Sequence, residues 1–246
     1  MTRANPWLQR FHPSPRSDVQ VICFPHAGGS ASFYHALSAA LSPSAELLAV
    51  QYPGRQERRH EPPITDLRLL AGRIAEVLGP GGDRPRVFFG HSMGALVAYE
   101  TVLTLGGHGP SALFVSGRRA PSRVRHEMLH LLDDHDLVAH LKALNGSEAA
   151  VLADEELRKL VLTTVRADYR AIETYRPEAG ARLDCPISAL TGDADPLTTL
   201  AEAQAWSTHT NSGFELHVFS GGHFFIRDHN AAVAKAILKC LETIDA

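Results

Sequence analysis

The chain alternates short apolar runs with longer stretches in which apolar residues recur at helical spacing. In the short runs both sets of alternating positions are apolar, which predicts strands buried on both faces, as in a parallel sheet covered by helices. These runs span residues 19–24, 46–51, 86–90, 112–116, 187–191 and 214–219. Helical spacing is clearest over residues 65–78, 92–105 and 231–244. The alternation predicts right-handed crossovers and a doubly wound α/β sheet.

The alternation is interrupted over residues 118–182, where no strand is predicted. Two amphipathic stretches, 128–144 and 154–175, indicate helices there. Because ligands bind outside the carboxyl ends of the strands in open α/β sheets, we expect this insertion to form a helical lid subdomain over the site. A pair of ordinary packing helices is the alternative. We expect the whole chain, 1–246, to be a single α/β domain that carries this insertion.

Composition and charge exclude several classes of protein. Apolar residues make up 44% of the chain, and 24 Lys and Arg stand against 27 Asp and Glu, so neither a disordered chain nor a nucleic-acid surface is expected. No segment approaches the ~20 apolar residues of a membrane span, and the N-terminal residues lack the apolar run of a signal peptide. A cytoplasmic protein is therefore expected. The 3 cysteines have no CxxC spacing, which predicts neither disulfides nor a zinc site but small apolar core residues: Cys23, Cys185 and Cys240.

The segment GHSMG places Ser92 between Gly90 and Gly94, after a predicted strand and before a predicted helix. In this context G-x-S-x-G forms a sharp turn that exposes the serine hydroxyl as a nucleophile. A serine hydroxyl is a poor nucleophile at neutral pH, so it needs a base that takes its proton and donors that stabilise the oxyanion. A glycine turn without a catalytic role is the alternative.

The chain order of such sites is serine, acid, histidine, so the base should follow a late strand. Among 14 histidines, His223 stands in the loop after the strand 214–219 and is the predicted base. His217 is expected to be a core or edge residue of that strand, and His229 a capping or surface residue. His91, next to Ser92, is expected to pack or to support the site indirectly.

The acid should lie in the loop GDADPL, which follows the strand 187–191 and offers Asp193 and Asp195. Asp195 lies farther beyond the strand end and is better placed to reach the histidine loop, so it is the favoured acid. An aspartate there would hold the imidazole in the correct tautomer and stabilise the imidazolium. Asp193 is expected to form the turn and remains the second candidate.

The oxyanion hole needs two backbone N–H groups, one from the residue after the nucleophile and one from the loop after the first core strand. The first is that of Met93. The loop FPHAGG, residues 24–29, is glycine-rich and precedes a helix, which suits an anion, and Ala27 is the predicted second donor. This loop lacks the phosphate-binding patterns of nucleotide sites.

Two further groups of charged or titratable residues have competing interpretations. His126 and His130 are four residues apart, and His135 and His140 follow in the same stretch. An i, i+4 pair on a helix could chelate a metal, but the acids around these histidines are scattered, so a solvated helix face is favoured and no metal is expected. Arginines cluster after two predicted strands and suit either an anionic partner or ordinary solvated charge. The clusters are Arg55, Arg58 and Arg59, and Arg118, Arg119, Arg123 and Arg125.

Taken together, these segments resemble a known family. The segments FPHAGGSASFY, QYPGRQER, FFGHSMGALVAYE, LTGDADP and GGHFF, in this order and at these spacings, resemble the type II thioesterases that accompany modular polyketide and nonribosomal peptide synthetases. The resemblance runs from about Val21 to the last helix. It implies the α/β-hydrolase fold, with a helical lid between the fourth and fifth predicted strands.

The resemblance also implies a function. The chain is similar to stand-alone hydrolases that remove unwanted acyl groups from the phosphopantetheine arm of acyl or peptidyl carrier proteins. By position, the family's nucleophile falls on Ser92, its base on His223, its acid on Asp195 and its oxyanion donors on Ala27 and Met93. Carrier proteins are usually acidic, which favours docking at Arg118, Arg119 and Arg123. The enzyme would act as a monomer without a cofactor of its own.

One family feature is absent. The lid of the family usually carries GG followed by a small residue and proline, whereas this chain reads LNGSEAAVL over residues 144–152. The departure leaves the mobility of the lid and the preferred acyl group open. Two other functions also remain: a small-molecule carboxylesterase or lipase with the same triad, and a non-enzymatic relative, which would normally have lost a triad residue.

Overall fold

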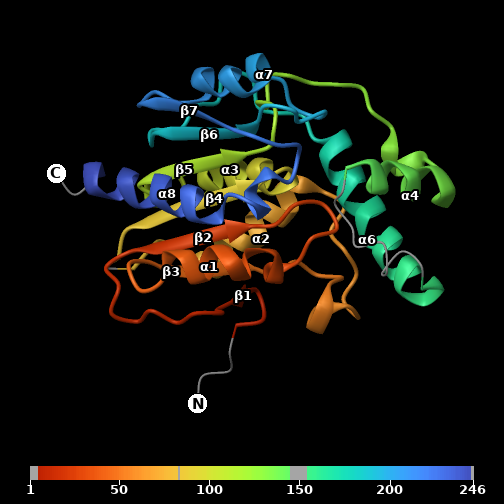
Figure 1. The fold of residues 1–246 in the computed structure, drawn as a ribbon, viewed down its shortest axis with the longest axis horizontal. Coiled ribbons are helices and arrows are strands. Elements are labelled where there is room, and N and C mark those ends of the chain that lie inside the picture. The colour runs from red at the N-terminus through yellow and green to blue at the C-terminus, as the bar shows by residue number, and fades with distance from the viewer. Residues whose placement is uncertain (1–4, 83, 145–153, 245–246) are drawn as a thin grey trace.

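The computed structural model describes residues 5–82, 84–144 and 154–244. Its centre is a 7-stranded sheet with the strand order β1-β3-β2-β4-β5-β6-β7 (Figure 1). The short β1 runs antiparallel to β3, and the other neighbouring strands are parallel. The predicted α/β fold is confirmed. The strands are β1 (Leu8–Gln9), β2 (Gln20–Phe24), β3 (Glu46–Val50), β4 (Arg86–His91), β5 (Ala112–Ser116), β6 (Ile187–Gly192) and β7 (Phe214–Phe219).

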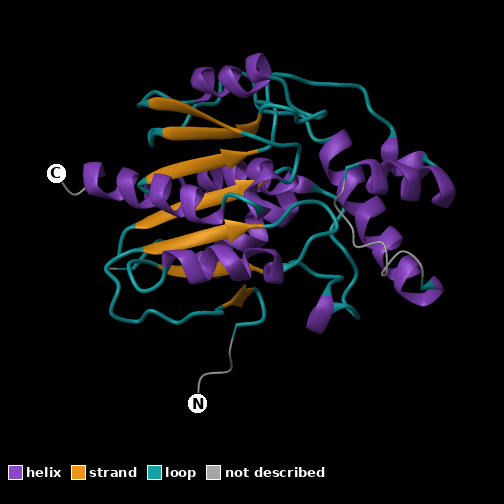
Figure 2. Ribbon diagram, viewed as in Figure 1, coloured by secondary structure: helices purple, strands orange, loops and turns teal. Residues whose placement is uncertain are grey.

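Helices cover both faces of this sheet (Figure 2). Successive strand residues point to opposite faces, so Ile22 and Phe24 of β2 pack in one apolar cluster and Val21 and Cys23 in the other. The first cluster includes α2 and α3, and the second includes α1 and α8. The α-helices of these two layers are α1 (His35–Leu41), α2 (Leu67–Leu78), α3 (Met93–Leu105) and α8 (Asn230–Ile244).

Short helices complete the described fold. α7 (Leu200–Gln204) follows β6 and begins with a capping box between Thr199 and Glu202. Single 3-10 turns lie mainly in the loops beside the strand ends, where the chain changes direction. They are η1 (Ala31–Tyr34), η2 (Gln56–Arg58), η3 (Gly106–His108), η4 (Leu129–Leu131), η5 (Ala205–His209) and η6 (Phe225–Arg227).

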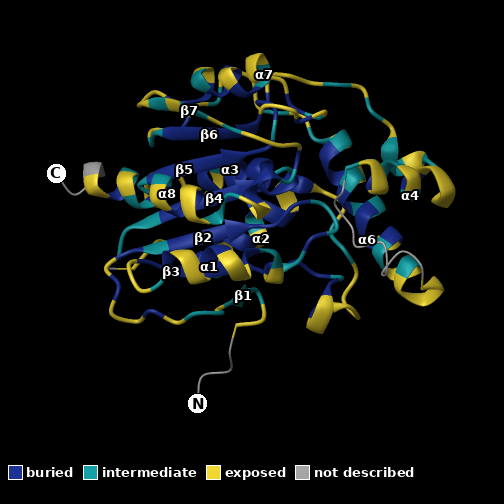
Figure 3. Ribbon diagram, viewed as in Figure 1, coloured by how far each residue is buried: buried dark blue, intermediate teal, exposed yellow. Residues whose placement is uncertain are grey.

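One strand of the sheet is not predicted, and the prediction for another needs correction. β1 is not predicted, because two residues are too short to show a period. β7 is predicted as a strand buried on both faces, but Glu215 and Val218 are exposed. It forms an edge of the sheet and lies beside the buried β6 (Figure 3). Its apolar run reflects packing on one neighbour, β6, and on the last helix. The other predicted strands are buried as expected.

The cysteine prediction is correct for one residue in three. Cys23 is fully buried within β2, whereas Cys185 and Cys240 are only partly buried. The latter two lie at the margins of the apolar clusters, a position that apolar sequence context alone does not distinguish from the core.

The insertion lies between β5 and β6, beyond the ends to which the strand arrowheads point (Figure 2). Helix α6 (Glu155–Thr174) matches its prediction and starts after Asp154, whose side chain caps it. The stretch 128–144 is not one helix: it consists of η4 and α4 (Asp134–Ala143), because Asp133 accepts a hydrogen bond from the Asp136 N–H and sets the start of α4. Apart from Leu144, the segment LNGSEAAVL lies outside the described residues.

A separate apolar cluster joins α4 to α6. It consists of Leu137 and Leu141 from α4 with Leu162 and Val165 from α6. The insertion therefore has a small core of its own, while the same α6 continues into the main cluster through Ala171 and Ile172. None of the described helices is both long and apolar enough to cross a membrane.

Close packing of α3 on the sheet yields a stability prediction. A Cβ on Gly94 would lie 1.9 Å from the carbonyl oxygen of Phe24, a backbone atom that cannot rotate away. We expect Gly94→Ala to lower the free energy of unfolding by about 3 kcal/mol or more, and the melting temperature by roughly 10 °C. Differential scanning calorimetry measures both.

Gly72→Ala is the matched control, because Gly72 lies inside α2 and a Cβ there meets nothing within 4 Å. Alanine has the higher helix propensity, so this variant should gain about 0.5–1 kcal/mol. Equal melting temperatures for the two variants would contradict the packing argument.

Candidate active site

The turn from β4 into α3 exposes Ser92. Its backbone has φ 55° and ψ −116°, a conformation that is strained for a residue with a Cβ. The N–H of Ser92 donates to the carbonyl of Ser116, 2.8 Å away, which anchors the turn to β5. A Cβ on Gly90 would lie 2.2 Å from the Gly94 carbonyl oxygen, so glycine is required there as well. The sequence prediction of a sharp glycine-flanked turn is confirmed.

A hydrogen-bonded chain of side chains starts at this serine. Ser92 Oγ lies 3.0 Å from His223 Nε2, and His223 Nδ1 lies 3.0 Å and 3.1 Å from the two carboxylate oxygens of Asp195. The side chains of His223 and Asp195 are 2% and 0% exposed, so water hardly competes for these bonds. Serine, histidine and aspartate follow β4, β7 and β6, whose carboxyl ends meet at one edge of the sheet.

The two aspartates of the β6 loop have different positions. Asp195 Oδ1 also accepts a hydrogen bond from the Leu197 N–H at 2.8 Å, which fixes its carboxylate toward His223. Asp193 is exposed and accepts instead from the Gly221 N–H at 2.9 Å, so it ties the β6 loop to the histidine loop. The geometry thus selects Asp195, the favoured candidate, as the partner of His223.

The other histidines of this region do not reach Ser92 Oγ. His217 is partly buried in the edge strand and lies 3.3 Å from the carboxylate of Glu215. His229 directly precedes α8, and its Nε2 contacts the carbonyl and hydroxyl of Ser220. Both positions agree with the sequence interpretation.

Two buried, neutral histidines, His26 and His91, lie near His223. The His91 and His223 rings have centroids 5.2 Å apart, and His91 Nδ1 lies 3.0 Å from Ser116 Oγ. Burial, and then the proximity of His223, lower the pKa of His26 to about 3 and that of His91 well below its usual value. His91 therefore packs beneath the site, as expected, while His26 reaches the cavity described below.

The predicted oxyanion donors flank Ser92. Ala27, in the loop after β2, lines the same cavity as Ser92 and His223. Within the described chain its N–H has no hydrogen-bond partner. Met93 is the first residue of α3, so its N–H has no carbonyl partner within that helix and gains from the helix dipole. Both N–H groups thus remain candidates for the oxyanion donors.

A cavity of about 80 Å³ lies between Ser92 and the insertion. Its apolar wall comes from α4, the residue after α4, and α6: Leu141, Leu144, Val161, Val165 and Ile172. Its polar wall consists of His26, Arg118, Arg119, Glu127, His140, Tyr169 and Glu173. The sequence pattern missed the cavity-facing Glu127, His140 and Tyr169, because in a helical insertion it does not distinguish a cavity wall from a solvated face.

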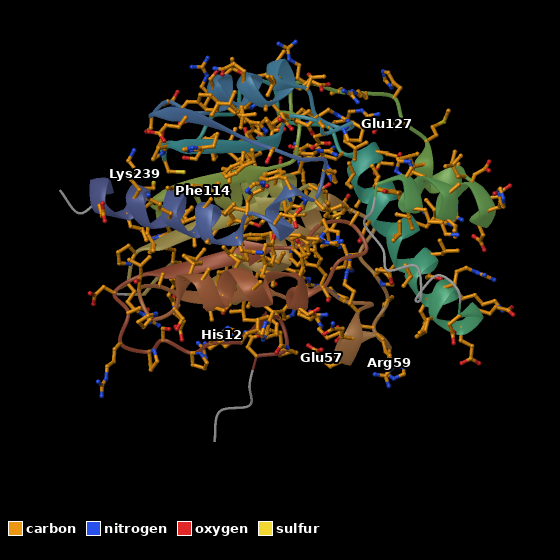
Figure 4. The ribbon with its side chains drawn as sticks, in the orientation of Figure 1. His12, Glu57, Arg59, Phe114, Glu127 and Lys239 are labelled. Atoms are coloured by element: carbon orange, nitrogen blue, oxygen red, sulfur yellow. The ribbon has the colours of Figure 1, made fainter. Side chains whose placement is uncertain are left out.

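The arginines divide into buried and exposed groups. Arg119 is 6% exposed and donates to the carboxylate of Glu127, which is labelled in Figure 4 beside α6. Arg118 lines the cavity; its Nε is buried without a partner among the described residues, and burial followed by repulsion from Arg119 lowers its pKa to about 9. Arg123 alone of the three predicted docking residues is exposed.

The first arginine cluster is largely internal. Arg55 and Arg58 are 6% and 4% exposed, and both donate to backbone carbonyls, so they are structural residues, not solvated charges. Arg59 is exposed and points away from the body of the protein (Figure 4). Sequence proximity grouped these residues, whereas the fold separates them.

The histidine pairs do not form a chelating face. His130 Nδ1 contacts Glu173, and His140 lines the cavity. In the described chain, a metal ion could find three neighbouring ligands only at Asp133, His135 and Asp136, all exposed. Asp133 already serves as the N-cap of α4, and exposed acidic groups of this kind are common without a metal ion.

A mostly parallel sheet with a serine turn after β4, an aspartate after β6 and a histidine after β7 has the arrangement of an α/β-hydrolase. The family model described as thioesterase domain matches residues 19–241. A solved structure, that of the type II thioesterase BorB from the borrelidin biosynthetic cluster, is 48% identical, with a TM-score of 0.89 over 98% of this chain and 100% of that one. The chain belongs to the thioesterase family and, within it, to the type II thioesterases.

Other relatives agree. A probable cadicidin biosynthesis thioesterase of Streptomyces griseus is 52% identical over 237 residues, 96% of this chain; the chain spans 66% of that protein's length. Thioesterase PikA5 of Streptomyces venezuelae is 47% identical, and the match covers 90% of this chain and 80% of the length of PikA5. YbtT, a type II thioesterase from the yersiniabactin pathway, has a TM-score of 0.87 at 28% identity and covers 98% and 100% of the two chains. The family resemblance seen in the sequence is confirmed.

The unequal positions of the two aspartates generate a kinetic prediction. Asp195→Asn should lower kcat for thioester hydrolysis by roughly 10³- to 10⁴-fold, because His223 would lose the partner that sets its tautomer, while KM changes by less than about threefold. Asp193→Asn should leave kcat within about threefold of the wild type. Steady-state kinetics with an acyl thioester decides between them, and a larger loss for Asp193→Asn would reverse the assignment.

The buried His26 yields a pH prediction. Its pKa in the folded protein is about 3, against 6.5 for a free histidine, so below pH 6.5 the unfolded chain binds a proton that the folded chain does not. This contribution to stability is lost as the pH falls from 6.5 toward 3. Between pH 6 and pH 4.5 the wild type should lose about 2 kcal/mol more than His26→Leu.

Urea unfolding of both proteins at the two pH values measures this difference. Parallel pH dependence of the two free energies of unfolding would show that His26 does not stay neutral in the fold.

Proposed function

We propose that this protein hydrolyses acyl thioesters carried on the phosphopantetheine arm of acyl or peptidyl carrier proteins, and so clears blocked polyketide or nonribosomal peptide assembly lines. The observation that supports this most directly is the hydrogen-bonded chain of Ser92, His223 and Asp195 at a cavity that Ala27 also lines. Relatives named for the biosynthesis of cadicidin, borrelidin and yersiniabactin support the biological setting.

In the first half of the reaction, Ser92 Oγ attacks the thioester carbonyl carbon and its proton passes to His223 Nε2. The carbonyl oxygen becomes an anion that accepts hydrogen bonds from the N–H groups of Ala27 and Met93. Collapse of the tetrahedral intermediate breaks the C–S bond, and the departing sulfur takes the proton from His223. The products are an acyl ester on Ser92 and the free thiol of the pantetheine arm.

In the second half, water replaces the thiol. His223 Nε2 takes a proton from the water, whose oxygen attacks the ester carbonyl carbon, and the same two N–H groups stabilise the second oxyanion. Breakage of the ester bond returns the proton from His223 to Ser92 Oγ and releases the carboxylic acid. Asp195 stays ionised and stabilises the imidazolium in both halves.

A second cavity offers a path for the pantetheine arm. It shares Arg118, Arg119, Ile172 and Glu173 with the first and continues to Arg123 and Arg176. The arm would enter past Arg123, whose exposed side chain has no partner among the described residues, and Arg118 Nε–H would donate to an acceptor on the bound substrate. Docking of an acidic carrier protein is thus proposed for the surface around Arg123, with Arg118 and Arg119 acting inside.

The insertion would then serve as the lid of the site. Its helices α4 and α6 provide the apolar wall of the cavity, which suits the hydrocarbon part of an acyl group. The monomeric state and the cytoplasmic location stay predictions from the sequence.

The substrate proposal has a direct test. Hydrolysis rates of an acyl carrier protein thioester, the same acyl group on a pantetheine analogue, and a p-nitrophenyl ester are compared for the wild type, Ser92→Ala and Arg123→Glu. We expect kcat/KM to be highest for the carrier-bound thioester, and Ser92→Ala to abolish turnover of all three. Arg123→Glu should raise KM for the carrier substrate roughly threefold to tenfold and leave the small thioester unchanged, because only the former meets the surface charge.

Two results would contradict the proposal. Full thioester turnover by Ser92→Ala would exclude the serine mechanism. Equal kcat/KM for the p-nitrophenyl ester and the carrier-bound thioester would favour a small-molecule carboxylesterase. Arg59→Glu, at another exposed arginine outside both cavities, is the control for a general effect of charge reversal.

A further inference from the structure

A buried ion pair connects helix α6 of the insertion to the loop after β2 that carries Ala27, which we call the oxyanion loop. Asp168, in α6, is 1% exposed and contacts Nη2 of Arg55, which is 6% exposed and lies in the loop after β3. These residues are 113 positions apart in the sequence. Taking two charges out of water is costly unless hydrogen bonds compensate. Here Arg55 donates from Nε, Nη1 and Nη2, and Asp168 Oδ2 accepts two hydrogen bonds. The location of the remaining bonds shows what the pair holds in place.

Both partners bond to the backbone of the loop that carries Ala27. Asp168 Oδ2 accepts the N–H of Gly28 at 2.7 Å, and Arg55 Nε–H donates to the carbonyl of Gly29 at 2.8 Å. The Gly28 N–H belongs to the peptide group that directly follows Ala27. Asp168 therefore fixes the peptide group that directly follows Ala27, a residue that lines the cavity beside Ser92.

Packing reinforces this contact. Gly28 has φ +73°, and a Cβ on it would lie 2.5 Å from Val165 Cγ2 of α6, so the helix lies directly against the loop. Thr164, the residue before Val165, donates from Oγ1 to the carbonyl of Gly54 at 3.1 Å. Arg55 is held in turn by the Pro53 carbonyl and lies 5.0 Å above the ring of Tyr52. Three successive contacts of α6 thus bind the two loops.

We propose that Asp168 and Arg55 are positioning residues, which aim the Ala27 N–H at the oxyanion and make the oxyanion hole dependent on the docking of helix α6. The inference rests on the proposed function, since it assigns Ala27 as a donor. It adds a coupling: the helix that forms the wall of the acyl cavity also holds the loop that stabilises the transition state. A substrate that displaces α6 is bound but hydrolysed slowly.

The test uses Asp168→Asn, which keeps the shape of the side chain but removes its charge. A misplaced donor weakens the transition state more than the ground state, so kcat should fall roughly 10- to 100-fold while KM stays within about threefold. Affinity for a trifluoromethyl ketone analogue, which forms a tetrahedral adduct with Ser92, should fall by the same factor as kcat/KM. Affinity for the corresponding unreactive thioether should not change.

Glu46→Gln is the matched control. Glu46, in β3 and outside the cavity, is 3% exposed and its carboxylate pairs with Arg84. Loss of this charge should lower the melting temperature without affecting kcat at 25 °C. Arg55→Lys gives a second readout if Asp168→Asn folds poorly: it keeps the charge but loses the Nε–H donated to Gly29, and should show the same split between kcat and KM.

The proposal is overturned if folded Asp168→Asn and Arg55→Lys keep wild-type kcat, or if both lose affinity for the adduct and the thioether equally. Failure of the proposed function would look different. In that case Ser92→Ala would retain turnover or would still form the ketone adduct, whatever the two positioning variants do.

Discussion

Helix α3 lies so close to β2 that a single methyl group at Gly94 would overlap the carbonyl of Phe24. The chain must leave β4 and enter this helix within one residue, and Ser92 takes the strained conformation that allows it. The close approach places the N-terminus of α3, with its free N–H groups, next to the loop after β2. One packing constraint between helix and strand thus brings together the proposed nucleophile, the helix dipole and the proposed oxyanion loop.

Once this turn is fixed, the parallel strands position the other two residues of the proposed triad. β6 and β7 end beside each other, so the loops that carry Asp195 and His223 are in contact, and Asp193 bonds one to the other. The rings beneath His223 are neutral because burial keeps His26 and His91 deprotonated. Because these two rings carry no charge, they do not repel the imidazole of His223 when it takes a proton.

Much of this arrangement could be predicted from the sequence. Buried parallel strands leave continuous apolar runs, and the catalytic residues stand in loops directly after them, so strand order alone places Ser92, Asp195 and His223 at one edge. The errors have physical reasons. β7 has an apolar run but only one strand neighbour, and an arginine in a loop gives no sign of whether it is solvated, as Arg59 is, or paired across 113 residues, as Arg55 is with Asp168.

The cavity wall was the least predictable part, because helix periodicity marks an apolar face without saying what it packs against. α6 uses one face for three purposes: Leu162 joins the core of the insertion, Val165 touches both the cavity and the oxyanion loop, and Ile172 joins the main core. A helix tied at so many points cannot adjust to a larger acyl group without moving the oxyanion loop. Acyl selectivity in this enzyme would therefore be expressed in the rate of hydrolysis as well as in binding.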